Sequence, residues 1–170
     1  SSRRRHTRSY LKSRGLGDVY KRQPLEGGYM GIISTGLGYT TEMGSLSQNF
    51  CVPEDATTLS LDWNFLSEEF MEWVGSQYQD YFEIAIIDED GNPTVLFYKT
   101  IDNIAGEYPP SLVSPEIVFD QGDVYGTGWQ SSSFDITAFA GTAVTLVLTS
   151  GDVGDSIYDT VILLDDITVE

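Results

Sequence analysis

The sequence has almost no cations after its first 23 residues. Residues 24–170 contain one basic residue, Lys99, against 25 acidic residues, which gives this part of the chain a net charge of −24. A surface of this charge repels nucleic acid and anionic membranes, so we expect neither as a partner. Three explanations of the acidity stay open: bound calcium, life in high salt, or an ordinary solvated surface.

Histidine and cysteine are also nearly absent. The only histidine, His6, lies in the first 23 residues, and the only cysteine is Cys51. Histidine-based catalytic triads, histidine zinc sites and thiolate zinc clusters are therefore excluded from residues 24–170. One cysteine makes no intrachain disulfide, and no apolar run reaches the length of a membrane span, so we expect no membrane insertion.

The first 23 residues differ sharply from the rest of the chain. They hold eight of the nine basic residues, and residues 18–23 (DVYKRQ) resemble a translated adapter from metagenomic sequencing libraries. They lack the apolar stretch of a secretory signal. We expect residues 1–23 to be a disordered, artefactual tail, the native N-terminus to be missing, and residues 24–170 to form a single domain.

Apolar and polar residues alternate in short segments along residues 24–170, with turn residues between them and no long helical pattern. About eight such segments predict an all-β fold, an antiparallel β-sandwich of jelly-roll or CUB-like type. One short helical turn is expected near 67–74, with Ser67 as its N-cap. Residues 101–126 are expected to be irregular, with a short edge strand at 117–119. The expected strands are 29–35, 45–52, 57–66, 80–87, 94–100, 128–136, 143–149 and 161–169.

Acidic residues gather around one turn and one loop of the predicted sandwich. Glu68, Glu69 and Asp80 follow the strand 57–66, and the loop 151–160 carries further aspartates. Loops at one end of a sandwich converge, so the loop can meet the acidic turn. Calcium takes such hard oxygen ligands. Spacing alone leaves open a calcium site or a solvated acidic end.

Asp165 interrupts an apolar row in the last expected strand. Val161, Leu163, Ile167 and Val169 lie on one face of this strand, and Asp165 falls in the same row. A buried carboxylate is costly unless it is paired or binds a metal. Asp165 is therefore either a calcium ligand or turned out of the row by a bulge, and both interpretations stay open.

The acidic turn carries the most specific pattern of the chain. Residues 64–70 (NFLSEEF), 74–76 (VGS) and 80–82 (DYF) resemble the hallmark of the choice-of-anchor L domain family, although Gln79 stands where the family has asparagine. Residues 153–159 and 164–167 resemble the end of such domains. The resemblance implies that the loop 151–160 meets the turn. It also implies a bacterial surface or secreted module within longer proteins, so we expect this chain to be a fragment.

Two further similarities bear on the ligands. The closing segment is similar to jelly-roll carbohydrate-binding modules, in which a late aspartate helps to bind a structural calcium ion. A weaker similarity is to calcium-binding CUB-like domains, where an acidic turn meets a late loop that contains aspartate. None of these resemblances supplies a biochemical activity by itself.

The sequence thus predicts a non-catalytic, calcium-stabilised β-sandwich of a secreted or cell-surface bacterial protein that serves adhesion or matrix interaction. One alternative is a carbohydrate-binding module in which Trp73 and Tyr78 are exposed and stack on sugar rings. Another is a glycoside hydrolase that pairs Glu68 or Glu69 with Asp80. Expected partners are a glycan or a surface protein. The predicted calcium ligands are Glu68, Glu69, Asp80, Asp155, Asp159 and Asp165.

Overall fold

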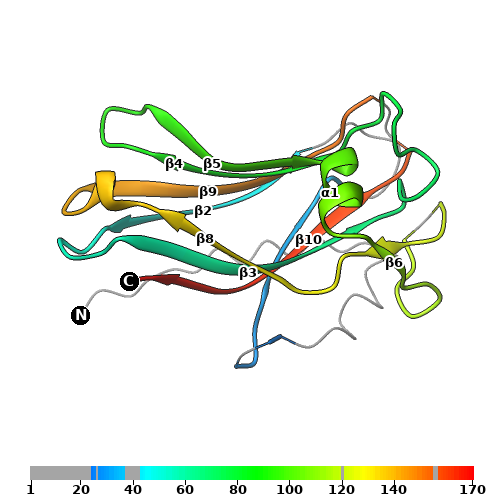
Figure 1. Cartoon of the computed structure of the whole chain (residues 1–170), viewed down its shortest axis with the longest axis horizontal. Helices are drawn as coiled ribbons and strands as arrows, with labels where there is room; N and C mark the ends of the chain where they lie inside the picture. Colours follow the sequence, from blue (N-terminus) through cyan, green and yellow to red (C-terminus); the bar gives the residue numbers. More distant parts are fainter. Residues whose placement is uncertain (1–23, 26, 37–42, 120, 155–156) are drawn as a thin grey trace.

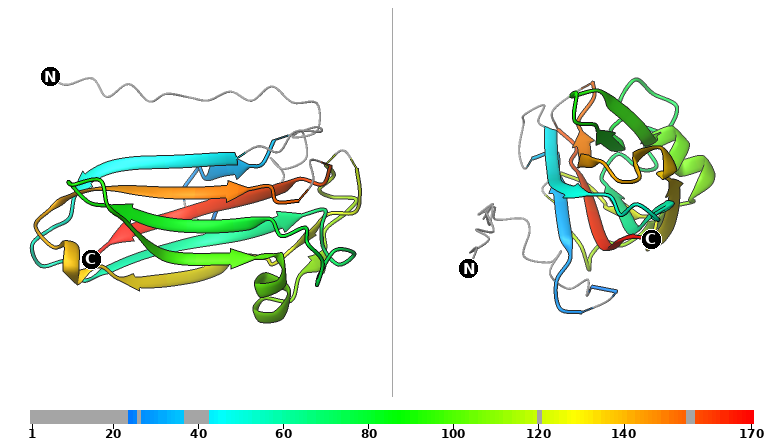
Figure 2. Two further views of the ribbon diagram at one scale, coloured as in Figure 1. Left: turned by 90° about the horizontal axis from the view of Figure 1, so that it is seen from above. Right: turned by 90° about the vertical axis from the view of Figure 1, so that its left-hand side faces the viewer.

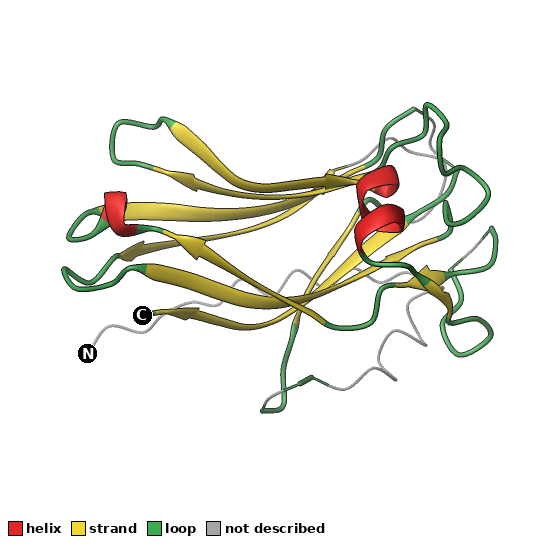
Figure 3. Ribbon diagram, in the orientation of Figure 1, coloured by secondary structure: helices red, strands yellow, loops and turns green. Residues whose placement is uncertain are grey.

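The computed structural model describes residues 24–25, 27–36, 43–119, 121–154 and 157–170, so the prediction for residues 1–23 lies outside the described residues. Two antiparallel sheets pack face to face, which confirms the predicted all-β sandwich (Figure 1, Figure 3). All eight expected strands form, within two residues of the predicted ends. The strands are β1 (Gly31–Ser34), β2 (Met43–Cys51), β3 (Thr58–Ser67), β4 (Tyr81–Ile87), β5 (Pro93–Thr100), β6 (Ser111–Leu112), β7 (Tyr125–Gly126), β8 (Gln130–Asp135), β9 (Ala143–Gly151) and β10 (Thr160–Val169).

The order of the strands brings two connections to the same end of the sandwich. Sheet A has the order β1-β10-β3-β7-β6, with β8 also paired to β3, and sheet B has the order β2-β9-β4-β5. The β3–β4 and β9–β10 connections each cross from one sheet to the other (Figure 2). Ser67 at the end of β3 pairs with Thr160, and Tyr81 at the start of β4 pairs with Gly151. The two crossings therefore lie together.

The space between the sheets is filled by aromatic and branched side chains. Trp63 is fully buried, and its ring lies 6.0 Å from Phe82, 5.5 Å from Phe97 and 5.0 Å from Tyr108, measured between centroids. Such tilted and edge-on ring pairs add to the free energy of apolar burial. Because successive side chains of a strand alternate, the burial of Phe82 fixes its neighbours Tyr81 and Glu83 on the outer face of sheet B.

A second, smaller core lies on the outer face of sheet A. Val113, Ile117, Phe119 and Val124 pack there against Leu66 of β3 and against two residues of β10. The expected edge strand at 117–119 is therefore wrong. Residues 114–117 form a turn and a bend, and Ile117 and Phe119 are buried against the outer face of sheet A instead of pairing at its edge.

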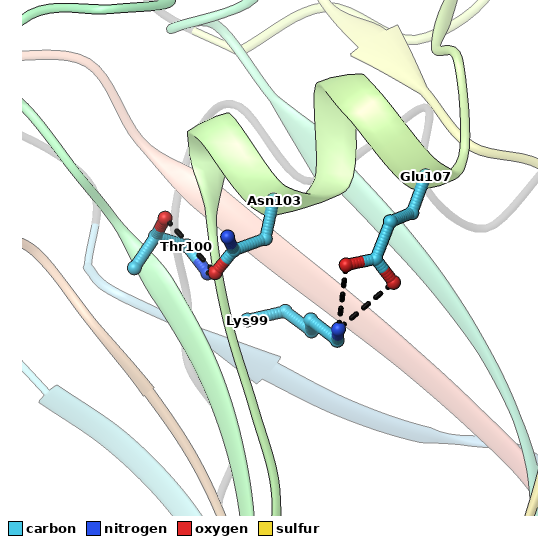
Figure 4. Close-up of polar contacts among 4 residues, drawn as sticks. All are labelled: Lys99, Thr100, Asn103 and Glu107. Carbon is cyan, nitrogen blue, oxygen red and sulfur yellow. Dashed lines mark hydrogen bonds and ion pairs between the residues drawn. The ribbon is translucent and has the colours of Figure 1, made fainter.

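The predicted helical turn near 67–74 forms as a single turn, in which the Trp73 N–H donates to the Glu69 carbonyl at 3.0 Å, and the helix of the fold lies elsewhere. Strand β3 continues to Ser67 because that residue still pairs with β10, and the segment after it is a turn. The helix is α1 (Ile101–Glu107), in the stretch expected to be irregular, and η2 (Thr137–Phe139) is a 3₁₀ turn. Asn103 accepts a hydrogen bond from the Thr100 backbone N–H at 3.2 Å, a capping interaction that fixes the start of α1 (Figure 4). No helix among the described residues is long and apolar enough to cross a membrane.

Candidate functional site

The two crossings are joined by backbone and carboxylate hydrogen bonds. Val153 donates its N–H to Asp80 Oδ1 at 3.0 Å, and its carbonyl accepts the Gln79 N–H at 3.2 Å. Asp159 donates its N–H to Glu68 Oε2 at 3.3 Å, and its carbonyl accepts the Glu68 N–H at 3.2 Å. The predicted meeting of the loop 151–160 with the acidic turn is confirmed. We call this end the acidic corner; its carboxyl groups belong to Glu68, Glu69, Asp80, Asp152 and Asp159.

Glu68 connects three segments of the acidic corner. Its side chain is only 3% exposed. Besides the Asp159 N–H, its carboxylate accepts the N–H groups of Gln121 and Gly122 at 2.9 and 2.8 Å. Backbone N–H groups directed at one carboxylate stabilise its charge and are stronger than neutral hydrogen bonds. Glu68 therefore fixes the β3–β4 turn, the start of β10 and the loop around residue 121 relative to one another.

A buried hydroxyl network supports the same corner. The Thr160 hydroxyl donates to Ser67 Oγ at 3.0 Å, and Ser67 Oγ also accepts the Glu69 N–H at 3.0 Å. Thr160 also binds Thr35, directly after β1: its N–H donates to Thr35 Oγ1 at 3.0 Å and its carbonyl accepts the Thr35 N–H at 3.0 Å. Ser67 thus has the polar contacts expected of a cap, but it makes them as the last residue of a strand.

The predicted calcium ligands fall into separate groups. Glu69, Asp80 and Asp159 are at most 1% exposed, and all belong to the acidic corner. Among the described residues, however, no three acidic, histidine or cysteine side chains gather closely enough to hold a metal ion. Asp155 lies outside the described residues. Calcium binding at the corner stays a prediction.

The structure does not bring Asp165 to the acidic corner. Asp165 pairs with Asp62 of β3, whereas the corner begins where Thr160 pairs with Ser67. Five residues along a strand correspond to about 17 Å. Asp165 instead accepts the N–H of Leu25 at 2.6 Å, near the beginning of the described chain.

The apolar residues in the same row as Asp165 are not buried in the interior of the sandwich. Val161 and Leu163 face outward from sheet A and are buried by the second core, not by the interior of the sandwich. Asp165 itself is half-buried, and the register of β10 shifts directly after it, where Asp166 has φ 46°. A bulge is therefore present, but it follows Asp165 and does not turn it out: Asp165 stays on the outer face with Val161 and Leu163, and Val169 after the bulge packs against the main core.

The predicted sugar-binding aromatics, Trp73 and Tyr78, pack against each other. Their ring centroids are 5.0 Å apart in an edge-on arrangement, and Tyr158 lies 6.1 Å from Trp73. Both predicted residues are half-buried rather than fully exposed. A pocket of about 480 Å³ lies at the acidic corner, with Tyr125 and Tyr158 in its lining. We call it the corner pocket.

A set of side chains that the sequence did not single out shares the outer face of sheet B. Residues opposite one another in neighbouring strands point to the same side. One row across the sheet joins Ser45, Thr149, Glu83 and Tyr98, and the next joins Met43, Gly151, Tyr81 and Thr100. Strands β2, β9, β4 and β5 lie side by side in Figure 2. We call this surface the tyrosine face; it comprises Met43, Ser45, Tyr81, Glu83, Tyr98 and Thr149.

Tyr81 and Tyr98 dominate the tyrosine face. Their rings stack at 5.1 Å between centroids with an interplanar angle of 28°, and Tyr98 is 47% exposed. Tyr81 lies over Gly151 so closely that a Cβ at that position would overlap its ring, and its hydroxyl donates to Met43 Sδ at 3.4 Å. Burial raises the pKa of Tyr81, and the Glu83 carboxylate and Tyr98 raise it further. The hydroxyl is therefore protonated at neutral pH.

The tyrosine face is nearly free of charge. The four strands of sheet B contain only two charged residues, Glu83 and Lys99. Lys99 is held by Glu107 of α1, whose two carboxylate oxygens lie 2.7 and 2.8 Å from its Nζ (Figure 4). Among the described strands, five acidic residues occur in all, and four of them belong to sheet A. The acidic side chains of the strands are therefore concentrated on sheet A.

Comparison with known proteins yields neither a matching family model nor a matching curated protein. Among solved structures, a family 61 carbohydrate-binding module in complex with β-1,4-galactotriose has 10% identity and a TM-score of 0.48, with 86% of this chain and 72% of that chain covered. The K2 cleaved adhesin domain of Lys-gingipain has 18% identity and a TM-score of 0.48, covering 92% and 79%. A family 28 carbohydrate-binding module specific for non-crystalline cellulose has 10% identity and a TM-score of 0.45, with 81% of this chain and 73% of that chain covered. At these values the similarity does not transfer a ligand, and the choice-of-anchor L resemblance stays a prediction.

Replacing Glu68 with glutamine should destabilise the fold. The amide keeps one acceptor oxygen but directs an NH₂ group at a backbone N–H donor, so we expect the free energy of unfolding to fall by about 2–3 kcal/mol. Glu72→Gln, an exposed change in the same turn, should alter it by less than about 0.5 kcal/mol. Urea denaturation measures both, and equal midpoints for the two variants would contradict the role of Glu68.

The packing of Tyr81 on Gly151 can be tested with a double-mutant cycle. Gly151→Ala should cost about 1–3 kcal/mol of stability, because the added methyl group displaces the ring. In a Tyr81→Ala background the same change should be neutral or slightly stabilising, since glycine weakens a strand by about 0.5–1 kcal/mol relative to alanine. Additive effects of the two substitutions would show that the ring does not lie where described.

Proposed function

We propose that this chain is a non-catalytic glycan-binding module of a secreted or cell-surface bacterial protein, and that the tyrosine face contacts the glycan. The observation that carries the proposal is the stacked pair of Tyr98 and Tyr81, with the carboxylate of Glu83 beside it, on an open sheet face. Adhesion or matrix attachment is the role such a module would serve.

The chemistry of the tyrosine face suits a sugar. A pyranose ring presents C–H groups on its faces and hydroxyl groups around its edge. The half-exposed Tyr98 ring offers a surface for the C–H groups, while Glu83 and Ser45 offer polar oxygens in the same row. The row crosses four strands and is about 14 Å long, enough for a short run of sugar rings.

The acids proposed for a glycosidase argue against catalysis. Such enzymes need two carboxyl groups that reach the scissile bond from opposite sides. Glu69 and Asp80 are fully buried, and Glu68 is 3% exposed with its oxygens directed at backbone N–H groups. These buried positions support a structural role for the acidic corner, and we therefore assign glycan binding to the exposed tyrosine face.

Glycan binding should depend on Tyr98. Tyr98→Ala removes the exposed ring, so we expect affinity for the bound glycan to fall about tenfold or more, as for other central aromatic contacts. The matched control is Tyr29→Ala, since Tyr29 is 85% exposed and lies outside sheet B. A glycan array followed by isothermal titration of the positive glycans provides the measurement.

Trp73→Ala separates the tyrosine face from the aromatic residues that the sequence predicts. If the tyrosine face is the site, this variant binds glycan as the unmodified chain does. Loss of binding in Trp73→Ala with full binding in Tyr98→Ala would move the site to the acidic corner and refute the proposal for the tyrosine face.

We also propose calcium as a structural ion of the acidic corner. The gathering of Glu69, Asp80 and Asp159 at one end of the sandwich supports it, because calcium takes carboxylate oxygens as ligands. Lys99, the only basic residue after residue 23, pairs with Glu107.

An ion that binds only the folded chain should raise its melting temperature. At a calcium concentration a hundredfold above Kd the stabilisation is about 2.7 kcal/mol, which corresponds to roughly 5–10 °C for a domain of this size. Thermal melting of the full chain with calcium, with magnesium and with a chelator measures it. The same midpoint in all three would eliminate the metal role.

A further inference from the structure

The tyrosine face also restricts the charge of its ligand. We propose that it selects neutral glycans and rejects glycans that carry carboxylate or sulfate groups, with Glu83 as the specificity-determining residue. This inference rests on the proposed function, because it concerns the same surface and the same class of ligand.

Glu83 lies in the middle of the surface that a glycan would cover. It pairs with Tyr98 on one side and with Thr149 on the other, and Tyr81 is two residues away on the same face. A sugar stacked on Tyr98 therefore meets the Glu83 carboxylate directly. A hydroxyl group can donate to that carboxylate, whereas a uronate or sulfate group would bring a second negative charge into contact with it.

No cation on the described part of sheet B offsets this repulsion. Proteins bind anionic groups through arginine or lysine, or through the N-terminus of a helix. Lys99 is the one basic residue of sheet B, and it pairs in register with the inward-facing Phe82. Its Nζ lies 5.9 Å from the centre of the Phe97 ring and is bound by Glu107, so its charge is directed to the core side and not to the tyrosine face.

The rest of the domain adds a longer-range contribution of the same sign. Residues 24–170 carry a net charge of −24. Such a charge lowers the local concentration of anionic ligands and slows their association, and salt screens the effect. The local contact at Glu83 and the overall field therefore both disfavour anionic glycans, and the two differ in how strongly salt weakens them.

The test uses the full chain and pairs of polysaccharides that share a backbone and differ in charge. Hydroxyethyl cellulose with carboxymethyl cellulose is one pair, and β-1,4-galactan with its sulfated derivative is another. Affinity electrophoresis and isothermal titration measure binding at about 0.01 M and about 1 M salt, where the screening length falls from roughly 30 Å to 3 Å.

We expect at least one neutral polysaccharide to bind and its charged derivative to bind about tenfold or more weakly in low salt. High salt should narrow this difference without removing it. Glu83→Gln should reduce the affinity difference between the neutral and the charged polysaccharide in low salt and in high salt. Glu72→Gln, which removes one charge outside sheet B, should leave this difference unchanged.

The outcomes distinguish failure of the selectivity for neutral glycans from failure of the proposed glycan binding. Equal or tighter binding of the charged derivative, lost in Tyr98→Ala, overturns the selectivity and leaves the proposed function in place. Binding of the charged derivative only in the presence of calcium also overturns the selectivity, because a bridging ion would then provide the missing cation. Absence of binding to every polysaccharide, neutral or charged, overturns the proposed function and the inference with it.

Discussion

The buried carboxylate of Glu68 is the contact on which one end of this sandwich depends. It accepts N–H groups from Gln121, Gly122 and Asp159, and thereby joins three segments that are distant in the sequence. A carboxylate is suited to this position because its two oxygens can accept several hydrogen bonds at once. Neutral residues of similar size have fewer acceptors, so the acidity of the turn has a structural cause.

The acidic corner in turn positions the tyrosine face. Asp80 accepts the N–H of Val153, two residues beyond Gly151, and so fixes the end of β9 beside the start of β4. The Tyr81 ring lies over Gly151, and Tyr98 stacks on that ring. A buried polar network therefore supports an exposed aromatic surface, which is a way to keep binding side chains in one arrangement before the ligand arrives.

Much of the fold was predictable because alternation reports directly on a half-buried strand. The segments around Trp63 and Phe82 alternate clearly, and their strands form as expected. Alternation gave a wrong prediction where a residue is buried outside the interior of the sandwich. Ile117 is one case, because it packs in the second core, which no local sequence pattern reveals. The helix at Ile101–Glu107 was missed because nearby prolines suggested irregular structure, although the spacing of Thr100 and Asn103 is that of a capping pair.

The candidate site was predictable only in part. The meeting of the turn with the loop 151–160 followed from the family resemblance and is confirmed by the bonds of Glu68 and Asp80. The position of Asp165 was not predictable, because the apolar residues of its row are buried by a second core outside the sandwich. Tyr81 and Tyr98 belong to different strands, and their stacking depends on a cross-strand register that single-strand patterns do not contain.

The most direct test of the account is to map the glycan contact on the chain itself. Amide chemical shifts recorded by NMR during titration with a bound neutral oligosaccharide would locate it. The account predicts that the shifts concentrate on the outward-facing residues of β4, β5 and β9, around Tyr81, Glu83 and Thr149. Shifts confined to the corner pocket, near Tyr125 and Tyr158, with none on sheet B, would contradict it.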